Sequence, residues 1–576
     1  MTSTPIRTDV LVIGSGAAGM GAALKASEQG HSVLVVEQER HLGGTTAICG
    51  GWGWVPGNKG AEPQDSRDQA KAYIKALAGH GYREEPVDAF LNSIPEALDF
   101  YERQGVRIVY GAMSPDYQMD APGAMEKGRA VTFERADARM LGEDRLRVQP
   151  YLMPYTVFGY MPEIGTDIAR MVKANQSVGN FAYAARNVLT AWGQTLLARR
   201  AWTRTNGNAL MTWIFAAARE AGIRMWTGTR AERLLTDERG VVVGAELSGG
   251  HAGRVEARLG VVLACGGFGG NAELRRRYFQ HDPDGDDHVT PTIGHDGSAL
   301  RLAEPLGGYI DNSPHQPASW GPITPFHTLV RRKQTYFPHL RAFGLPGLIA
   351  VDRTGRRFAN ESLSYHDYGI EMIKNDAERD RTYVWIIADA TAMRKYGIGY
   401  AKPWPFPPAI FQKEGYLRRA TTVEALAGQI NVDPQSLRRT IEEFNQGAAR
   451  GEDPAFGRGS LKYHNFKGDL EHRPNPNLAP LTKAPWYAVR VMMGDLGTYA
   501  GLAVNSRSEV LDEGGRPVPG LYAVGSAAVS VFGGGYPGYG AHVGPALVFS
   551  YRIGRDIAAH AAERGRGEWS GQPMAT

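Results

Sequence analysis

The 576-residue sequence predicts an α/β fold in which one domain is interrupted by another. Three observations support this prediction. A buried-strand pattern leads into a glycine-rich turn and a helix at residues 9–29, the stretch 290–487 is rich in Pro, Tyr, Trp and Phe, and a buried-strand pattern returns at 520–525. We therefore expect the first domain to occupy residues 1–289 and 488–576, with an inserted α+β domain at 290–487.

The first unit consists of a strand, the turn GSGAAG at 14–19, a helix to Gln29 and a second strand that ends at Glu37. An acid about 20 residues beyond such a turn is placed to accept a hydrogen bond from a ribose hydroxyl, and the helix N-terminus accommodates a pyrophosphate. The unit therefore predicts a Rossmann-like, dinucleotide-binding domain with a parallel sheet. The glycine-rich runs at 43–47 and 50–53 predict a second loop against the same ligand.

The remaining elements follow from hydrophobic periodicity and turn residues. They are a helical cover at 65–221, a three-stranded meander at 231–264, amphipathic helices at 422–430 and 433–447, and a closing helix at 544–560.

Composition excludes several classes of function. The 64 basic residues nearly balance 60 acidic ones, so nucleic acid is not an expected partner. Two cysteines are too few for a disulfide framework or a four-thiolate metal site, and no metal is expected. The N-terminus lacks a signal-peptide pattern, and no apolar run reaches the roughly 18 to 20 residues of a membrane span. We expect a cytoplasmic protein without a transmembrane segment, and peripheral membrane contact is left open.

Six segments resemble the FAD-binding domain of the fumarate reductase and succinate dehydrogenase flavoprotein superfamily. They are GSGAAG with Glu37, GGTTA, ACGGFGGN, GRRFANE, GDLGTYAGL and GLYAVGSAA. The resemblance implies FAD, bound non-covalently because no histidine lies within GGTTAICGG. It implies these cofactor-binding residues: Gly14, Gly16, Ala17, Ala18, Gly19, Glu37, Gly43, Gly44, Thr45, Thr46, Gly50, Gly51, Ala231, Gly266, Gly525, Ser526, Gly544, Pro545 and Ala546.

Within this superfamily, the segment YPGYG at 536–540 is similar to a signature of the 3-ketosteroid dehydrogenases. That resemblance implies that Tyr536 and the backbone N–H of Gly540 bind the substrate carbonyl. It also implies that Tyr365 is the catalytic base and that Tyr117 assists it. A tyrosine with a pKa near 10 needs a neighbouring donor or positive field to act as a base at neutral pH.

The resemblance implies a dehydrogenase that introduces a C=C bond next to a ketone and passes its electrons to an unidentified acceptor. Its expected substrate is a hydrophobic ketone, with a steroid as one candidate. The fumarate reductases carry arginines where this chain has Tyr365 and Tyr536, so a small dicarboxylate is disfavoured. Three alternatives stay open: an ene-reductase acting on another enone or unsaturated acid, a 3-ketosteroid 4-dehydrogenase, and an FAD-binding protein without catalysis.

Overall fold

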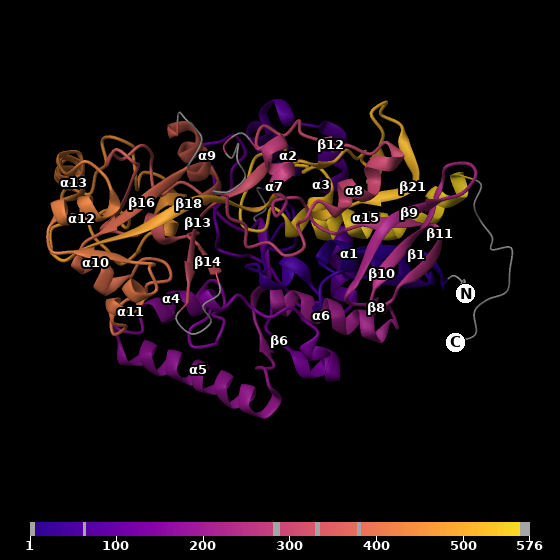
Figure 1. Cartoon of the computed structure of the whole chain (residues 1–576), viewed down its shortest axis with the longest axis horizontal. Coiled ribbons are helices and arrows are strands. Elements are labelled where there is room, and N and C mark those ends of the chain that lie inside the picture. Colours follow the sequence, from indigo (N-terminus) through magenta and orange to yellow (C-terminus); the bar gives the residue numbers. More distant parts are fainter. Residues whose placement is uncertain are drawn as a thin grey trace.

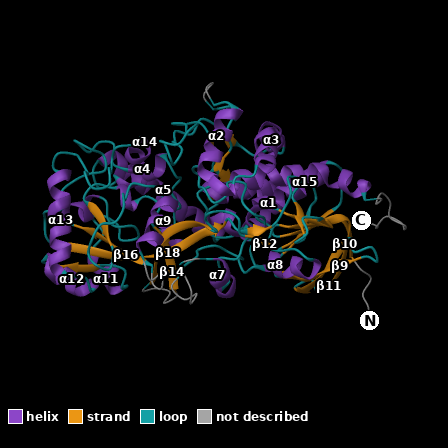
Figure 2. Ribbon diagram, turned by 90° about the horizontal axis from the view of Figure 1, so that it is seen from above, coloured by secondary structure: helices purple, strands orange, loops and turns teal. Residues whose placement is uncertain are grey.

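The computed structural model contains two large β-sheets arranged along the long axis of the molecule, with helices packed against both (Figure 1). Figure 2 shows the same order from above, with β9–β11 at one end and α12 and α13 at the other. The α/β class predicted from the sequence is confirmed. The structure describes residues 6–61, 65–279, 281, 288–328, 334–376 and 382–564.

The larger sheet has eight strands in the described part of the chain, in the order β20-β21-β11-β1-β2-β8, with β10 and β9 continuing from β11. β1 pairs in parallel with β2 and β11, and β11 pairs in parallel with β21. The end of the chain therefore completes a sheet that its first strand begins. The strands are β1 (Ile6–Ile13), β2 (Val33–Val36), β8 (Arg224–Trp226), β9 (Thr229–Thr236), β10 (Val242–Gly249), β11 (Gly253–Leu263), β20 (Glu509–Leu511) and β21 (Pro517–Ala523).

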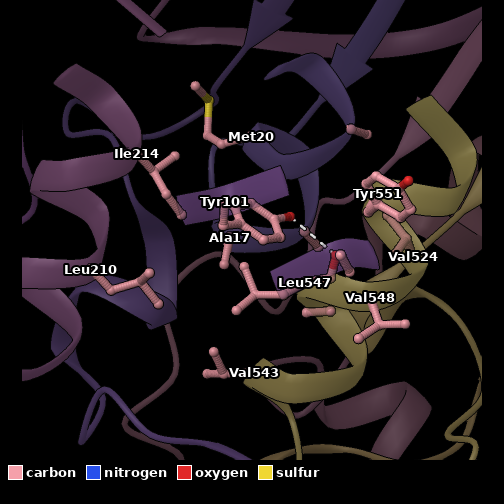
Figure 3. Packing of buried hydrophobic residues seen from close by; sticks show 14 of the residues in the cluster. Ala17, Met20, Tyr101, Leu210, Ile214, Val524, Val543, Leu547, Val548 and Tyr551 are labelled. Atoms are coloured by element: carbon pink, nitrogen blue, oxygen red, sulfur yellow. Dashed lines mark hydrogen bonds between the residues drawn. The ribbon is translucent and has the colours of Figure 1, made fainter. Parts of the chain in front are cut away.

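Two helices pack together against this sheet, α1 (Ala17–Glu28) and α15 (Val543–Glu563). Figure 3 shows Leu547 of α15 beside Ala17, with Tyr101 between the two helices. The hydroxyl of Tyr101 donates a hydrogen bond to the carbonyl oxygen of Leu547, at 3.1 Å. Since this core is fully buried, both helix N-termini are held at the edge of the sheet where the parallel strands end.

The second sheet has the order β14-β13-β18-β16-β15, with β17 paired to β18. Helix α9 (Tyr365–Asn375) packs against β13, and α12 (Val423–Ile430) and α13 (Pro434–Ala448) lie at its far end. The predicted domain limit at residue 487 falls within β18, a strand of the second sheet. The division into domains stays a prediction. The strands are β13 (Ala318–His327), β14 (Gln334–Pro338), β15 (Leu348–Val351), β16 (Tyr383–Ala388), β17 (Arg418–Ala420) and β18 (Trp486–Thr498).

The stretch 65–221 is largely helical, as predicted, but it also contains short strands and an irregular segment at 150–165. Its helices are α2 (Arg67–Ala78), α3 (Glu84–Arg103), α4 (Thr166–Val172), α5 (Val178–Ala198) and α6 (Asn206–Glu220). The other helices are α7 (Ala272–Tyr278), α8 (Ser298–Ala303), α10 (Ala390–Lys395), α11 (Pro408–Lys413) and α14 (Lys462–Lys467). The short strands are β3 (Gly53–Trp54), β4 (Ile108–Val109), β5 (Ala130–Phe133), β6 (Ala136–Asp137), β7 (Thr203–Arg204), β12 (Ile310–Asp311) and β19 (Gly501–Leu502).

Candidate active site

A cavity of about 1850 Å³, including the open space at its mouth, extends from the carboxyl ends of β1 and β2 to the first residue of α9. One end is lined by the glycine-rich turn after β1 and by Glu37. The other end is lined by Tyr365, Tyr536 and Tyr539. The cavity therefore connects a dinucleotide cradle on the larger sheet with a group of phenols contributed by two distant parts of the chain.

The cradle fits an extended dinucleotide. Gly14 has φ +110°, and a Cβ there would lie 2.3 Å from the carbonyl oxygen of Ala264, so only glycine is accommodated. Gly16 caps α1 without a side-chain hydrogen bond. The N–H of Ala17 donates to the hydroxyl of Thr46, at 3.2 Å, and the N–H groups that follow it are available to phosphate oxygens. Because helix N-termini and glycine turns bind anions in this way, the residues present fit the pyrophosphate of a dinucleotide.

Glu37 is buried at the end of β2 and lines the cavity. Its carboxylate accepts hydrogen bonds from the backbone N–H and the hydroxyl of Ser15, at 3.1 and 2.6 Å, and from the backbone N–H of Glu39, at 2.9 Å. Burial raises the pKa of Glu37, and these three donors oppose the shift. A carboxylate has about four acceptor sites, so one remains for a ribose hydroxyl.

Most of the cofactor-binding residues predicted from the sequence line this cavity. They are Gly14, Gly16, Ala17, Ala18, Glu37, Gly44, Thr45, Thr46, Gly50, Gly51, Ala231, Gly266, Gly525, Ser526 and Ala546.

Four other predicted cofactor residues, Gly19, Gly43, Gly544 and Pro545, lie outside the lining. A Cβ on Gly19 would meet the carbonyl oxygen of Gly14 at 2.0 Å, and a Cβ on Gly544 would meet that of Trp54 at 2.1 Å. These two glycines therefore permit close packing behind the cavity. The backbone N–H of Gly43 donates to the hydroxyl of Ser15 at 2.9 Å, which joins the two glycine-rich loops.

The phenols at the other end are packed ring against ring. The rings of Tyr365 and Tyr536 lie 5.1 Å apart between centroids, edge to face, and Tyr117 stacks on Tyr536 at 5.3 Å. The hydroxyl of Tyr117 donates a hydrogen bond to the hydroxyl of Tyr365, at 3.1 Å. Tyr117 lies behind the other two, outside the cavity lining. The structure thus brings together the three tyrosines singled out in the sequence.

Burial raises the pKa of Tyr365 well above its ordinary value of 10, and the neighbouring hydroxyl of Tyr536 contributes to the same shift. The hydrogen bond from Tyr117 acts in the opposite direction, because a donor stabilises the phenolate. Tyr117, which the resemblance singled out as the assisting tyrosine, is therefore a neighbouring donor of the kind that Tyr365 needs. It reduces the rise in the pKa of Tyr365 but does not overcome the effect of burial.

The turn that carries Tyr536 also presents a free donor. Gly540 has φ +96°, and a Cβ there would lie 2.5 Å from the carbonyl oxygen of Trp52. The carbonyl oxygen of Gly540 accepts from the backbone N–H groups of Trp54 and Gly544. Its own N–H donates no hydrogen bond to any residue that the structure describes. A phenol and an unpaired N–H thus line one wall of the cavity, as an oxygen-binding pair requires.

Several residues of the cavity wall were missed in the sequence. Tyr539 lies within the YPGYG segment, so this motif could have identified it as a residue of the site. His542 donates or accepts a 2.7 Å hydrogen bond with Ser319, and burial lowers the pKa of its imidazole to about 4. The histidine is therefore uncharged at neutral pH. The irregular segment at 150–165, which falls in the stretch predicted as helical cover, contributes Leu152, Tyr155, Met161 and Ile164.

Among the described residues, no group of three or more His, Cys, Asp or Glu side chains is placed to hold a metal ion. No helix in the same part of the chain has both the length and the apolar character needed to cross a membrane.

An interrupted dinucleotide-binding fold, whose glycine cradle opens onto a pair of phenols and a free backbone N–H, defines a flavin-dependent oxidoreductase. Comparison with known proteins gives the particular family. A family model described as FAD binding domain matches residues 9–543, and the chain belongs to this family. The FAD cofactor expected from the sequence is confirmed, and the chain is an FAD-dependent dehydrogenase or reductase acting on CH–CH groups.

Three relatives illustrate the resemblance. A 4-oxocyclohex-2-ene-1-carboxylate 5-dehydrogenase from Sinomonas cyclohexanicum is 55% identical over 99% of this chain and 96% of the relative. A 3-oxosteroid 1-dehydrogenase from Mycobacterium tuberculosis is 31% identical over 96% of this chain and 99% of the relative. A 3-ketosteroid Δ1-dehydrogenase from Sterolibacterium denitrificans, solved with 1,4-androstadiene-3,17-dione, matches with a TM-score of 0.88, 31% identity and coverage of 96% and 99%. The predicted resemblance to the 3-ketosteroid dehydrogenases is confirmed.

Proposed function

We propose that this protein desaturates a cyclic ketone next to its carbonyl group. Tyr365 takes the proton from the α-carbon, while Tyr536 and the N–H of Gly540 hold the carbonyl oxygen on which negative charge develops. FAD, which the glycine cradle and Glu37 would hold, would supply the acceptor for the hydride of the β-carbon. The observation that carries this proposal is the pairing of the two phenols, 5.1 Å apart between ring centroids, in the cavity that also contains the dinucleotide cradle.

We propose a monocyclic oxo-carboxylate as the substrate, of the kind named for the relative with 55% identity. The steroid favoured from the sequence is the second candidate, supported by the whole-chain match to a 3-ketosteroid Δ1-dehydrogenase at a TM-score of 0.88. The two candidates differ in one chemical respect that the chain can recognise. The oxo-carboxylate carries an anionic group on the ring carbon opposite its ketone, and the steroid does not.

A candidate partner for that carboxylate is Lys402, which lies behind the cavity wall and outside its lining. Its ammonium lies 5.5 Å from the centroid of the Phe337 ring, and Phe337 stacks at 5.5 Å on Tyr155, which lines the cavity. Burial lowers the pKa of Lys402 to about 8, so most of it is charged at neutral pH. No residue that the structure describes gives this ammonium a hydrogen bond or an ion pair, and a bound carboxylate would supply one.

The function is tested by mixing the oxidised holoenzyme anaerobically with 4-oxocyclohex-2-ene-1-carboxylate and, separately, with a saturated 3-ketosteroid. We expect the oxo-carboxylate to bleach the flavin rapidly. Its product, a dienone with a hydrogen opposite the carbonyl, tautomerises to 4-hydroxybenzoate, which chromatography detects. Bleaching by the steroid alone would move the assignment to steroid dehydrogenation, and bleaching by neither compound would overturn the proposed reaction.

Replacement of Lys402 by methionine is expected to raise KM for the oxo-carboxylate by about tenfold or more and to leave kcat nearly unchanged, because a charged hydrogen bond contributes about 1.5–3 kcal/mol. Steady-state kinetics with the acid and with its neutral methyl ester check this. The ester should show no such rise in KM. Lys413→Met, which removes an exposed lysine of α11, is the matched control and should behave as the wild type. Equal KM values for the acid in K402M and wild type would remove Lys402 from the binding site.

A further inference from the structure

Helix α5 has two apolar faces, of which the body of the protein covers only one. Its inward face buries Val188, Ala191 and Gln194, and Val188 and Ala191 pack with Tyr160 in a small separate core. Figure 1 shows α5 at the periphery of the molecule, below α4 and β6. The helix is therefore anchored along one side, and its opposite side faces solvent.

The solvent side carries an apolar stripe. Its residues are separated by three, eight, three and four positions, which places them on one face of a helix. Their exposed fractions range from 49% for Trp192 to 88% for Leu196. The exposed stripe comprises Val178, Phe181, Leu189, Trp192 and Leu196, with Leu197 beside it at 82% exposed. A row of exposed large apolar side chains along one face of a surface helix indicates an interaction surface.

The charge around the stripe has one sign. No Asp or Glu occurs from residue 168 to residue 203, whereas five basic residues do: Arg170, Lys173, Arg186, Arg199 and Arg200. Lys173 forms ion pairs with Asp469 and Glu471. Arg186 and Arg199 are exposed, and neither forms an ion pair with a residue that the structure describes. The surface therefore combines apolar side chains with uncompensated positive charge.

We propose that the exposed stripe, together with Arg186 and Arg199, docks on the surface of an anionic phospholipid membrane; we call these residues the α5 surface. A helix that lies in the membrane interface buries an apolar face among the acyl chains and places basic residues against anionic headgroups. A second copy of the chain is a poorer partner. In a symmetric dimer this basic surface would face itself, and like charges would repel.

The α5 surface adjoins the cavity. The indole N–H of Trp192 donates a hydrogen bond to the carbonyl oxygen of Phe158, at 2.8 Å, and Phe158 is itself 59% exposed. Phe158 belongs to the segment 150–165, which contributes Leu152, Tyr155, Met161 and Ile164 to the cavity lining. Lipid docking therefore places the membrane beside one wall of the candidate active site. This inference does not depend on the identity of the substrate.

Sedimentation of the purified holoenzyme with phospholipid vesicles tests the proposal. We expect binding to vesicles containing phosphatidylglycerol to exceed binding to pure phosphatidylcholine vesicles by about tenfold or more at low salt, and to weaken as salt is added. The triple variant Phe181→Ser, Leu189→Ser, Leu196→Ser should lose this binding and keep its FAD content, because these side chains are exposed. Met113→Ser, which changes an exposed apolar residue outside the α5 surface, is the matched control and should bind as the wild type.

Absence of sedimentation with anionic vesicles at low salt would overturn the proposal, as would a triple variant that binds like the wild type. Size-exclusion chromatography with light scattering tests the remaining alternative, in which the α5 surface joins two copies of the chain. If the wild type forms a dimer that the triple variant dissociates, and if it does not bind vesicles, the α5 surface is a subunit interface and the proposal is wrong.

Discussion

Replacement of Tyr365 by phenylalanine is expected to lower kcat by roughly 10²–10⁴-fold, the usual contribution of a positioned base. Tyr365 is buried, so phenylalanine fills the same space and only the hydroxyl that accepts the proton is lost. The measurement is single-turnover flavin reduction, with the visible spectrum as a check that FAD is retained. Tyr499→Phe is the matched control, because that buried hydroxyl has no hydrogen-bond partner in the described part of the chain. It should change kcat by no more than about twofold.

The dependence of the rate on pH gives a second test of the same residue. Burial raises the pKa of Tyr365 well above 10, so the phenolate is the minor form at neutral pH and its fraction rises with pH. Where proton removal limits the rate, kcat should therefore increase from pH 7 to 10 without reaching a plateau, and Y365F should lose this dependence. A wild-type profile that is flat from pH 7 upwards would contradict the assignment of Tyr365 as the base.

Replacement of Tyr536 by phenylalanine is expected to have the second large effect, a loss of about 10²–10³-fold in kcat. A loss of this size is typical when one donor to a developing oxyanion is removed. The unpaired N–H of Gly540 remains, so activity should fall without disappearing. Single-turnover flavin reduction measures the loss. Because Tyr536 does not remove the proton in our proposal, Y536F should keep the rise of kcat with pH that Y365F loses.

Two outcomes would contradict this role for Tyr536. A loss below about fivefold would mean that the phenol does not hold the carbonyl oxygen. A loss of FAD from the purified variant would mean that the hydroxyl serves the cofactor site instead. Gly540 itself does not provide a clean test, since an alanine Cβ would lie 2.5 Å from the backbone of Trp52 and would distort the turn.

Most of the residues at the cofactor end of the site were predicted from the sequence, because the main motif there consists of residues that lie close together in the chain. The turn GSGAAG, its helix and Glu37 lie within 24 consecutive residues, from Gly14 to Glu37, and glycine is required wherever backbone contacts backbone. The predicted residues outside the cavity lining show the limit of this reasoning. A motif indicates that Gly19 or Gly544 is needed, but it does not tell whether the glycine admits a ligand or a neighbouring strand or loop.

The substrate end was predicted only in part. Resemblance singled out Tyr117, Tyr365 and Tyr536, but no sequence pattern indicated that Tyr117 donates to Tyr365 across 248 residues. Lys402 and the segment 150–165 carried no motif at all. The apolar residues of α5 were expected to cover a core, and periodicity alone cannot say which face of a helix meets a neighbour.

The sequence by itself determined the cofactor and the fold class, since the glycine turn, its helix and Glu37 lie at short, fixed spacings. Its resemblance to the 3-ketosteroid dehydrogenases proposed the reactive side chains. The tertiary structure alone decided which phenol donates a hydrogen bond to which, that the Lys402 ammonium lies behind the cavity wall, and which face of α5 remains exposed. These properties depend on how two sheets and their helices pack, and such packing joins residues hundreds of positions apart through contacts that no local spacing records.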